Sequence, residues 1–258
     1  MLRVGACQTP ELLCDVPAAL ACMEDFARLA DAQGVDLLLF PECFLQGYLV
    51  EEAHLRSHAL DLGSAEFTSV LRRLDRIGQT LVFGVIERCG GRHFNSAVVV
   101  ARGELVATYR KIHLVPGERL FDKGDACPTF VLRDVRCGIA ICADTRSPEA
   151  AARVAAQGAR VLLVPAQNMM RREAAEHWKD AHHRIRAERA RETGMWLVSA
   201  DVTGKRDETR IGYGPTSIID PRGETVARVP LMTTGMAVAD IDLDAAGLTS
   251  GQGQVPRA

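Results

Sequence analysis

The sequence lacks the cysteine and histidine spacings that mark several classes of protein. It contains eight cysteines in 258 residues, but no C-x-x-C pair and no HExxH pattern. This argues against a disulfide scaffold and against a zinc cluster built from paired cysteines. We therefore expect most of the thiols to be reduced and buried. We also expect His177, His182 and His183 to be ordinary residues of a helix rather than metal ligands.

An excess of charge and a long apolar run are also absent. The formal net charge is -2, with 25% charged and 47% hydrophobic residues, which is ordinary for a globular protein. Nothing in this balance favours nucleic acid or an anionic membrane surface as a partner. No signal peptide or membrane span is visible, so we expect a cytoplasmic location. The length suffices for one large domain or two small ones.

Lysine is scarce, because only four of the 31 basic residues are lysines. One of them, Lys111, directly follows the strand predicted over residues 104–110. Lysine and arginine are not equivalent in a confined site, so a lysine in an arginine-rich chain indicates a position where arginine would not serve. The alternative is a solvated lysine at the end of a strand.

The stretch 135–149 predicts a buried strand that ends at a cysteine and turns into a helix. Apolar side chains alternate with small ones over residues 137–141, as in a central strand that is covered on both faces. Ser147 as N-cap and Pro148 at the first helical position predict a helix to residue 157. Cys142 would then lie beside a helix N-terminus, which lowers the pKa of a thiol. The alternative is that Cys142 is one more small buried residue.

Two carboxylates are further candidates. Residues 35–40 form a short apolar run, typical of a strand buried on both faces, and Glu42 follows at its carboxyl end. Sites in α/β folds are built at such strand ends, although an isolated glutamate is more often a surface loop residue. Glu118 lies in the loop expected over residues 112–124.

The remaining patterns predict alternating strands and helices. Helices are expected over 15–33, 64–78 and 171–193, strands over 2–8, 80–87, 94–102, 159–164, 195–201 and 236–241, and a polar loop over 203–214. Turn residues at Gly103 and over Asp220–Gly223 predict two hairpins. Two pairs of short segments within the chain have similar sequences: 34–41 resembles 158–165, and 102–107 resembles 222–227. This internal similarity favours a pseudo-symmetric α/β fold, a four-layer α-β-β-α sandwich.

The hairpins argue against the alternative architecture, an all-parallel TIM-type barrel. We predict one domain over residues 1–246. The Gly-, Ser- and Gln-rich residues 247–258 are expected to be a loose C-terminal tail.

Four ordered blocks of the sequence resemble those of the nitrilase or carbon–nitrogen hydrolase superfamily. The blocks are Phe40-Pro-Glu42, Tyr109-Arg-Lys111, Pro116-Gly-Glu118 and Gly138–Glu149, and the similarity covers nearly the whole chain. The resemblance implies the four-layer sandwich of the nitrilase type, commonly as a dimer packed through helices. It also implies a Glu-Lys-Cys triad, which it places on Glu42, Lys111 and Cys142, with Glu118 as an auxiliary carboxylate.

Within this superfamily the chain is similar to the amidase-like branches. Members that look like true nitrilases usually follow the cysteine with Trp-Glu, whereas this chain has Ala143-Asp144. An amide or a carbamoyl compound is therefore favoured over a nitrile, which stays as the alternative substrate. Ser147 departs from the usual bulky aromatic residue, and Ser199–Gly204 departs from the usual Asn-Arg form.

The expected activity is that of a thiol hydrolase that cleaves a non-peptide C–N bond through a Cys142 thioester and releases ammonia and an acid. Lys111 and the backbone N–H of Ala143 are expected to hold the oxyanion. Tyr48 and Asn168 are expected to bind substrate by their position. No cofactor and no metal are needed, and the partners are a small-molecule substrate and a second copy of the chain in a homodimer or higher homo-oligomer.

Three further alternatives stay open. The chain could be a non-catalytic member that binds a small molecule or a partner protein, although its four candidate residues are intact. A lyase that forms a Schiff base on Lys111 would need neither the cysteine nor Glu42. A papain-like hydrolase would use His113 as the base, but the strand pattern does not suit that fold.

Overall fold

The computed structural model describes residues 1–242, and within this range the strands form two sheets. The larger, nine-stranded sheet consists of β1 (Leu2–Pro10), β2 (Leu37–Leu39), β3 (Thr80–Cys89), β4 (Arg92–Ala101), β5 (Glu104–Arg110), β9 (Met170–Arg171), β11 (Val202–Lys205), β12 (Arg210–Tyr213) and β15 (Gly235–Ile241). Its strand order is β5-β4-β3-β2-β1-β11-β12-β9, and β15 pairs with β1 as well. β2 pairs in parallel with both β1 and β3.

The smaller sheet has six strands in the order β14-β13-β10-β8-β7-β6. They are β6 (Thr129–Leu132), β7 (Val135–Ile139), β8 (Val161–Pro165), β10 (Trp196–Ala200), β13 (Ser217–Ile219) and β14 (Thr225–Arg228). β8 lies between β7 and β10 and is parallel to both. The segments that echo each other in the sequence, 34–41 and 158–165, thus contain β2 and β8, an interior strand of each sheet.

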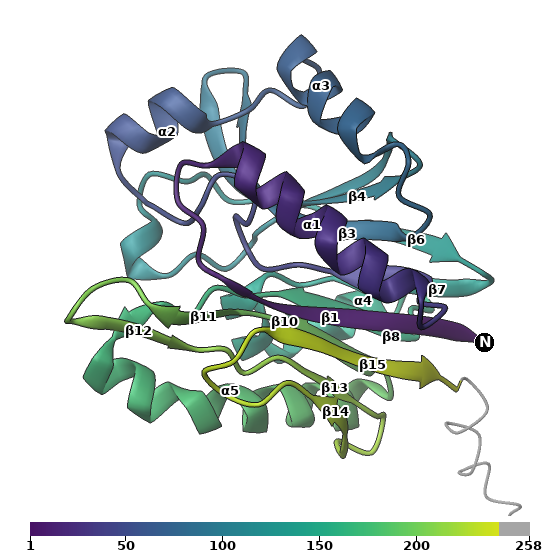
Figure 1. Cartoon of the computed structure of the whole chain (residues 1–258). Coiled ribbons are helices and arrows are strands. Elements are labelled where there is room, and N and C mark those ends of the chain that lie inside the picture. The colour runs from purple at the N-terminus through teal and green to yellow at the C-terminus, as the bar shows by residue number, and fades with distance from the viewer. Residues whose placement is uncertain (243–258) are drawn as a thin grey trace, which may run out of the picture.

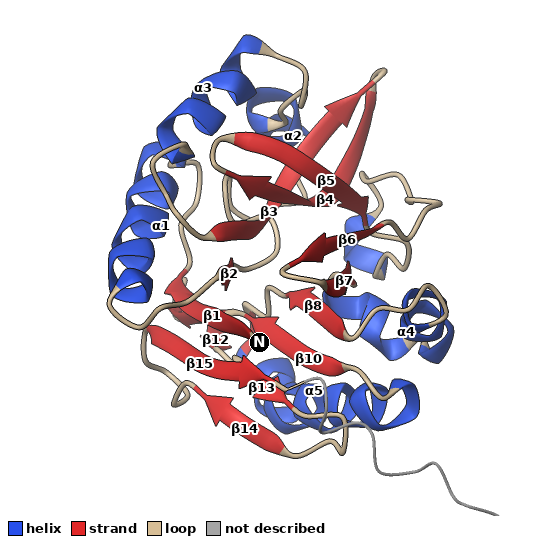
Figure 2. Ribbon diagram, turned by 90° about the vertical axis from the view of Figure 1, so that its right-hand side faces the viewer, coloured by secondary structure: helices blue, strands red, loops and turns tan. Residues whose placement is uncertain are grey.

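Helices cover the outer face of each sheet, so that the molecule has four layers (Figures 1 and 2). α1 (Val16–Asp31), α2 (Glu52–His58) and α3 (Ala65–Leu74) lie on the side of the larger sheet, and α4 (Pro148–Ala155) and α5 (Arg172–Thr193) on the side of the smaller one. The predicted α-β-β-α sandwich is confirmed. Among residues 1–242, no helix is both long enough and apolar enough to cross a membrane.

Apolar residues on both faces of the strands hold the layers together. In β4, Ala97 and Val99 belong to the core between the two sheets, whereas Val98 and Val100 pack in the core beneath α1 and α3. This alternation follows from the pleat, which points successive side chains to opposite faces. A strand that is covered on both faces needs apolar residues on both. The sequence of β4 is accordingly apolar from Ala97 onward.

Several boundaries predicted from the sequence are confirmed. Asp15 caps α1 by accepting a hydrogen bond from the Ala18 N–H at 2.9 Å, and Ser64 caps α3 by accepting from the Phe67 N–H at 3.2 Å. Gly194 ends α5 in the left-handed conformation, with φ 67°. The predicted hairpins join β4 to β5 and β13 to β14.

Other predictions were wrong. Residues 203–214 are not a loop: they extend the larger sheet as the hairpin of β11 and β12, because edge pairing with β1 and β9 satisfies their backbone. α2 and β6 were not predicted. Ser147 precedes α4 but does not cap it, since its hydroxyl donates to the Glu149 carboxylate at 2.7 Å. The predicted tail 247–258, like the end of the predicted domain 1–246, lies outside the described residues.

The cysteine prediction was partly wrong. All eight cysteines are free thiols, as expected, but only half are buried. Cys7, Cys43, Cys127 and Cys137 are buried, Cys22 and Cys142 are half-buried, and Cys14 and Cys89 are exposed.

Gly84 in β3 allows the chain after β2 to approach the sheet closely. A Cβ on Gly84 would lie 2.0 Å from the backbone nitrogen of Cys43 and 2.6 Å from the carbonyl carbon of Glu42. The Gly84 N–H donates to the Pro41 carbonyl at 3.0 Å, and its own carbonyl accepts from the Leu45 N–H at 3.1 Å. The backbone around Glu42 is thereby pinned against β3.

We predict that Gly84→Ala lowers the free energy of unfolding by about 1–3 kcal/mol, because the methyl group must displace backbone rather than a flexible side chain. Chemical denaturation measures this difference. Gly78→Ala is the matched control, since a Cβ there would meet nothing within 4 Å. Equal stabilities of Gly84→Ala and the parent protein would contradict the prediction.

Candidate active site

Glu42 lies where the two sheets meet. Its side chain follows the carboxyl end of β2 and is 2% exposed. The Phe40 N–H donates to the Val82 carbonyl in β3 at 2.8 Å, and the Glu42 N–H donates to the Ala166 carbonyl, just after β8, at 3.2 Å. Backbone hydrogen bonds to both sheets therefore fix the position of this carboxylate.

Lys111 extends from the end of β5 to two buried carboxylates. Its Nζ donates to Glu42 Oε1 at 2.7 Å and to Glu118 Oε1 at 2.9 Å. Glu118 ends a 3-10 turn over Pro116–Glu118, and its Oε2 accepts from the Val115 N–H at 2.9 Å. All three side chains are at most 2% exposed. The fold thus brings together the glutamates and the lysine that the sequence singled out.

Asn95 completes this cluster, although sequence reasoning missed it. Its Nδ2 donates to Glu42 Oε1 at 2.7 Å and to Glu118 Oε1 at 2.8 Å. Its Oδ1 accepts from the Cys43 thiol at 3.5 Å. The available signal was an asparagine that shortly precedes the apolar half of a strand. A buried polar side chain must find partners, which makes such a residue a candidate for a site.

Asp144 holds the turn that begins at Cys142. This turn is a 3-10 helix over Cys142–Arg146, and its first residue has φ 43°. Asp144 Oδ2 accepts from the Ile141 N–H at 2.9 Å and from the Tyr109 hydroxyl at 2.7 Å. Asp144 Oδ1 accepts from the N–H and the Nδ1–H of His113, at 2.7 and 3.1 Å. One carboxylate therefore joins the cysteine turn to the residues on both sides of the lysine.

Asn168, which follows β8, also faces the cysteine. Its Nδ2 and its backbone N–H both donate to the Asp201 carboxylate, the latter at 2.9 Å. The amide oxygen is then free to face Cys142, whose Sγ lies 3.9 Å from Asn168 Oδ1. Asp201 is fully buried and lies 3.6 Å from Nη2 of the buried Arg186. Sequence reasoning missed this ion pair, because the two residues lie on different elements.

Glu42 and Lys111 influence each other's protonation. Burial raises the pKa of Glu42, and the nearby Glu118 charge adds to this, whereas Lys111 opposes it. Burial by itself would lower the pKa of Lys111, but the charges of Glu42, Cys142 and Glu118 outweigh it and raise that pKa. The lysine is therefore a permanent cation at neutral pH.

The predicted lowering of the pKa of Cys142 was wrong. Burial of the thiol raises its pKa, Glu42 raises it further, and Lys111 opposes both. Burial and the Glu42 charge outweigh any effect of a helix N-terminus, because the 3-10 turn separates the thiol from α4, which begins only at Pro148. Because Glu42 and Lys111 both act on this thiol, the three side chains share one electrostatic environment.

Tyr48 and Ala143 also border this cluster. Tyr48 is half-buried, and burial together with the charges of Glu42 and Glu118 raises the pKa of its phenol. It is therefore a neutral hydroxyl donor beside the carboxylates. Ala143 follows Cys142 at the start of the 3-10 turn, where the first backbone N–H groups have no partner within the helix.

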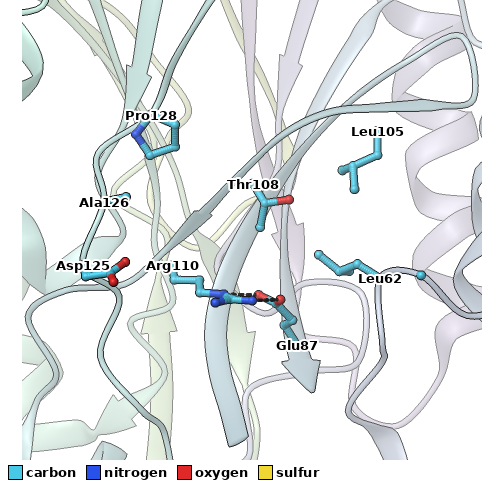
Figure 3. Close-up of a pocket in the computed structure, with 9 residues that line it drawn as sticks. Leu62, Glu87, Leu105, Thr108, Arg110, Asp125, Ala126 and Pro128 are labelled. Atoms are coloured by element: carbon cyan, nitrogen blue, oxygen red, sulfur yellow. Dashed lines mark hydrogen bonds and ion pairs between the residues drawn. The ribbon is translucent and has the colours of Figure 1, made fainter. Parts of the chain in front are cut away.

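A separate cavity lies beside β5 (Figure 3). Its lining residues are Leu62, Gly63, Glu87, Leu105, Thr108, Arg110, Asp125, Ala126 and Pro128. Arg110 and Glu87 point toward each other there as an ion pair, and the Ser96 hydroxyl also donates to Glu87, at 2.7 Å. The buried Glu87 charge is thus neutralised by partners of its own. The cluster around Lys111 and Cys142 is therefore the candidate active site.

The chain is similar in sequence to proteins of a known family. The sequence profile of the family described as Carbon-nitrogen hydrolase matches residues 3–250. The chain is 32% identical to an (R)-stereoselective amidase from Pseudomonas sp, over 76% of this chain and 69% of that protein. It is 30% identical to a nitrilase from Pyrococcus abyssi, over 94% and 90% of the two chains.

The fold is also found among solved structures. The crystal structure of an amidase from Nesterenkonia sp. superimposes with a TM-score of 0.79 at 24% identity, over 96% of this chain and 93% of that one. The chain belongs to the carbon–nitrogen hydrolase family. It is an amidase-like enzyme of this family, which confirms the resemblance seen in the sequence.

We predict that Lys111→Met lowers the free energy of unfolding by about 3–5 kcal/mol at neutral pH, because it leaves two buried carboxylates without their cation. The loss shrinks as the pH falls. Burial raises the pKa of Glu42 in the folded state above its ordinary 4.5. Between these two pKa values the folded state binds more protons than the unfolded state. The stability is therefore fully present below the ordinary pKa of a glutamate, and it is lost as the pH rises through the raised pKa of the folded state.

Chemical denaturation at a series of pH values between about 5 and 8 measures this dependence. Lys123→Met is the control, because Lys123 is exposed and its replacement removes the same charge. A Lys111→Met protein as stable as the control at every pH would contradict the role of the buried cation.

Proposed function

We propose that the chain hydrolyses a small amide or carbamoyl compound to an acid and ammonia through a thioester on Cys142. The observation that carries this proposal is the position of Lys111 Nζ between Glu42 and Glu118, at 2.7 and 2.9 Å, in a buried cluster whose charges act on the Cys142 thiol. Such a cluster combines a proton acceptor, a permanent cation and a nucleophile.

The first step is attack on the carbonyl carbon. Glu42 takes the proton of the Cys142 thiol as the sulfur forms its bond to that carbon, so a free thiolate need not accumulate. This suits a buried thiol whose pKa is raised. The carbonyl oxygen becomes negative, and Lys111 and the Ala143 N–H stabilise it in a site from which water is excluded.

The second step breaks the C–N bond. Glu42, now protonated, gives its proton to the leaving nitrogen, ammonia departs, and the acyl group stays on Cys142 as a thioester. Glu42 is then a carboxylate again and takes a proton from water, whose oxygen attacks the thioester. Collapse of this second intermediate returns the proton to the sulfur and releases the acid, so that one amide and one water give one acid and one ammonia.

The residues after the cysteine support an amide or carbamoyl group over a nitrile. All the hydrogen bonds of Asp144 described above run to groups of the protein, which gives this carboxylate a structural role. Tyr48 and Asn168 remain as groups that can orient the substrate, one as a hydroxyl donor and one through its amide oxygen. The similarity to an amidase agrees with this choice.

The setting of the enzyme is also part of the proposal. We propose a homodimer or higher homo-oligomer in the cytoplasm, acting on small molecules without a cofactor. The oligomeric state follows from the family resemblance, and sedimentation of the purified chain tests it. A monomer at working concentrations would remove this part of the proposal and leave the chemistry unaffected.

We predict that Cys142→Ala abolishes ammonia release, with a fall in kcat/KM of more than about a thousandfold, because the proposed acyl intermediate forms on the Cys142 sulfur. The measurement uses a panel of small amides, carbamoyl compounds and nitriles. Cys89→Ala, which removes an exposed thiol outside the cluster, is the matched control and is expected to keep full activity.

The panel separates the alternatives. Release from nitriles alone would replace the amide proposal with nitrile hydrolysis by the same residues. Activity that survives Cys142→Ala would overturn the thioester mechanism. If no compound of the panel releases ammonia and iodoacetamide does not alkylate Cys142, the non-catalytic alternative would be favoured.

We predict an acidic limb in the pH dependence of kcat/KM, with an apparent pKa above 4.5, because Glu42 must be ionised and its pKa is raised. Glu118→Gln removes a negative charge that raises this pKa, so the limb should move to lower pH even where the rate itself falls. A limb that stays in place or moves upward would show that another group controls it.

A further inference from the structure

Three potential metal ligands meet on the outer side of the turn that follows Glu42. Cys14 lies in the connection between β1 and α1, and His54 and His58 lie one turn apart on α2. One ligand atom of each residue lies within 4.8 Å of those of the other two. Figure 1 shows α2 beside the purple connection from β1 to α1.

We propose that Cys14, His54 and His58 bind one thiophilic divalent cation, with Zn²⁺ as the favoured ion. Zn²⁺ is a borderline-soft ion that takes thiolate and imidazole ligands in a tetrahedral arrangement. Three protein ligands leave the fourth position for water. The proposal concerns a site outside the catalytic cluster and does not depend on the reaction proposed above.

The distance between Cys14 and His54 suits such an ion. Bond lengths to tetrahedral Zn²⁺ place a thiolate sulfur and an imidazole nitrogen about 3.6 Å apart. Cys14 Sγ and His54 Nδ1 are 3.4 Å apart. The imidazole rings of His54 and His58 have centroids 4.7 Å apart and an interplanar angle of 35°. Histidines at positions i and i+4 share one helix face, which is a common metal-binding arrangement.

The surroundings of His54 orient it as a ligand. Its Nε2 lies 3.1 Å from the Gly47 carbonyl, and a carbonyl can only accept, so the proton is on Nε2. The lone pair of Nδ1 then points to Cys14. A backbone carbonyl on the second ring nitrogen is the usual support for a metal-bound histidine. A metal-bound imidazole must be neutral, and the hydrogen bond from Nε2 leaves Nδ1 unprotonated for the ion.

Cys14 is accessible and is held in place. It is exposed, so an ion can reach the sulfur from solvent. Its backbone N–H donates to the Gln46 carbonyl at 2.9 Å, and its φ of 56° is unusual for a residue other than glycine. A bound ion would therefore join the connection before α1, the 46–47 turn and α2. Tyr48, which borders the catalytic cluster, directly follows that turn.

Binding displaces one proton. The thiol of Cys14 loses its proton to buffer as the sulfur–metal bond forms, and both imidazoles bind as neutral ligands, so one ion taken up releases about one proton. The two segments come together only in the folded chain, since Cys14 and His54 are 40 residues apart in the sequence. This is why no metal site was expected from cysteine spacing.

The test is a titration of the chelator-treated full chain with Co²⁺, followed by Zn²⁺. We expect a thiolate-to-cobalt charge-transfer band that saturates at one ion per chain, and Zn²⁺ should abolish the band. Zn²⁺ at about 100 times its dissociation constant should raise the Tm by roughly 5–10 °C. Cys14→Ser should remove the band, and His58→Ala should weaken binding by more than about 100-fold.

Two control variants make the assignment specific. Cys89→Ser removes the other exposed thiol, and His177→Ala removes an exposed histidine on α5, so both should bind Co²⁺ like the parent chain. Circular dichroism confirms that each variant is folded. Absence of the band in the parent chain, or a band that survives Cys14→Ser, for example because Co²⁺ binds Cys142, would overturn the proposal.

Discussion

The ion pairing of Lys111 with two buried carboxylates is the constraint on which the site depends. Removing three charges from water is expensive, and their attraction offsets this only if the remaining oxygens find donors. Asn95 donates to both glutamates, and the Val115 N–H donates to Glu118. The ends of β2 and β5, the strand β4 and the 115–118 turn must therefore meet at one point, because a missing partner would leave a buried charge unpaired.

The two-sheet arrangement places the cysteine beside that cluster. Glu42 follows a strand of the larger sheet and Cys142 a strand of the smaller one, and the Glu42 N–H bonds to the chain after β8. Asp144 ties the cysteine turn to Tyr109 and His113 on either side of the lysine. The raised pKa of the thiol follows from this dry position. The proposed chemistry therefore uses proton transfer to Glu42 during attack rather than a stable thiolate.

Regular elements were predictable where a local pattern determines them. The capped starts of α1 and α3, the buried strand before Glu42 and both hairpins follow from spacing that a few neighbouring residues contain. The hairpin of β11 and β12 was not predictable in this way. Its residues 203–214 are polar and glycine-bearing, and only pairing with β1 and β9 makes them strands. Likewise, the pKa of Cys142 depends on burial by distant segments, not on its place before α4.

The sequence alone therefore determined the layered α/β class through local periodicity, and its ordered motifs predicted Glu42, Lys111, Glu118 and Cys142 as site residues. Tertiary structure alone decided which side chains complete the site. Asn95 and the pair of Arg186 and Asp201 join elements that are distant in sequence, as does the separate group of Cys14, His54 and His58 outside this site. The physical reason is that periodicity reports which face of an element is buried, whereas a contact between elements depends on how the sheets and helices pack.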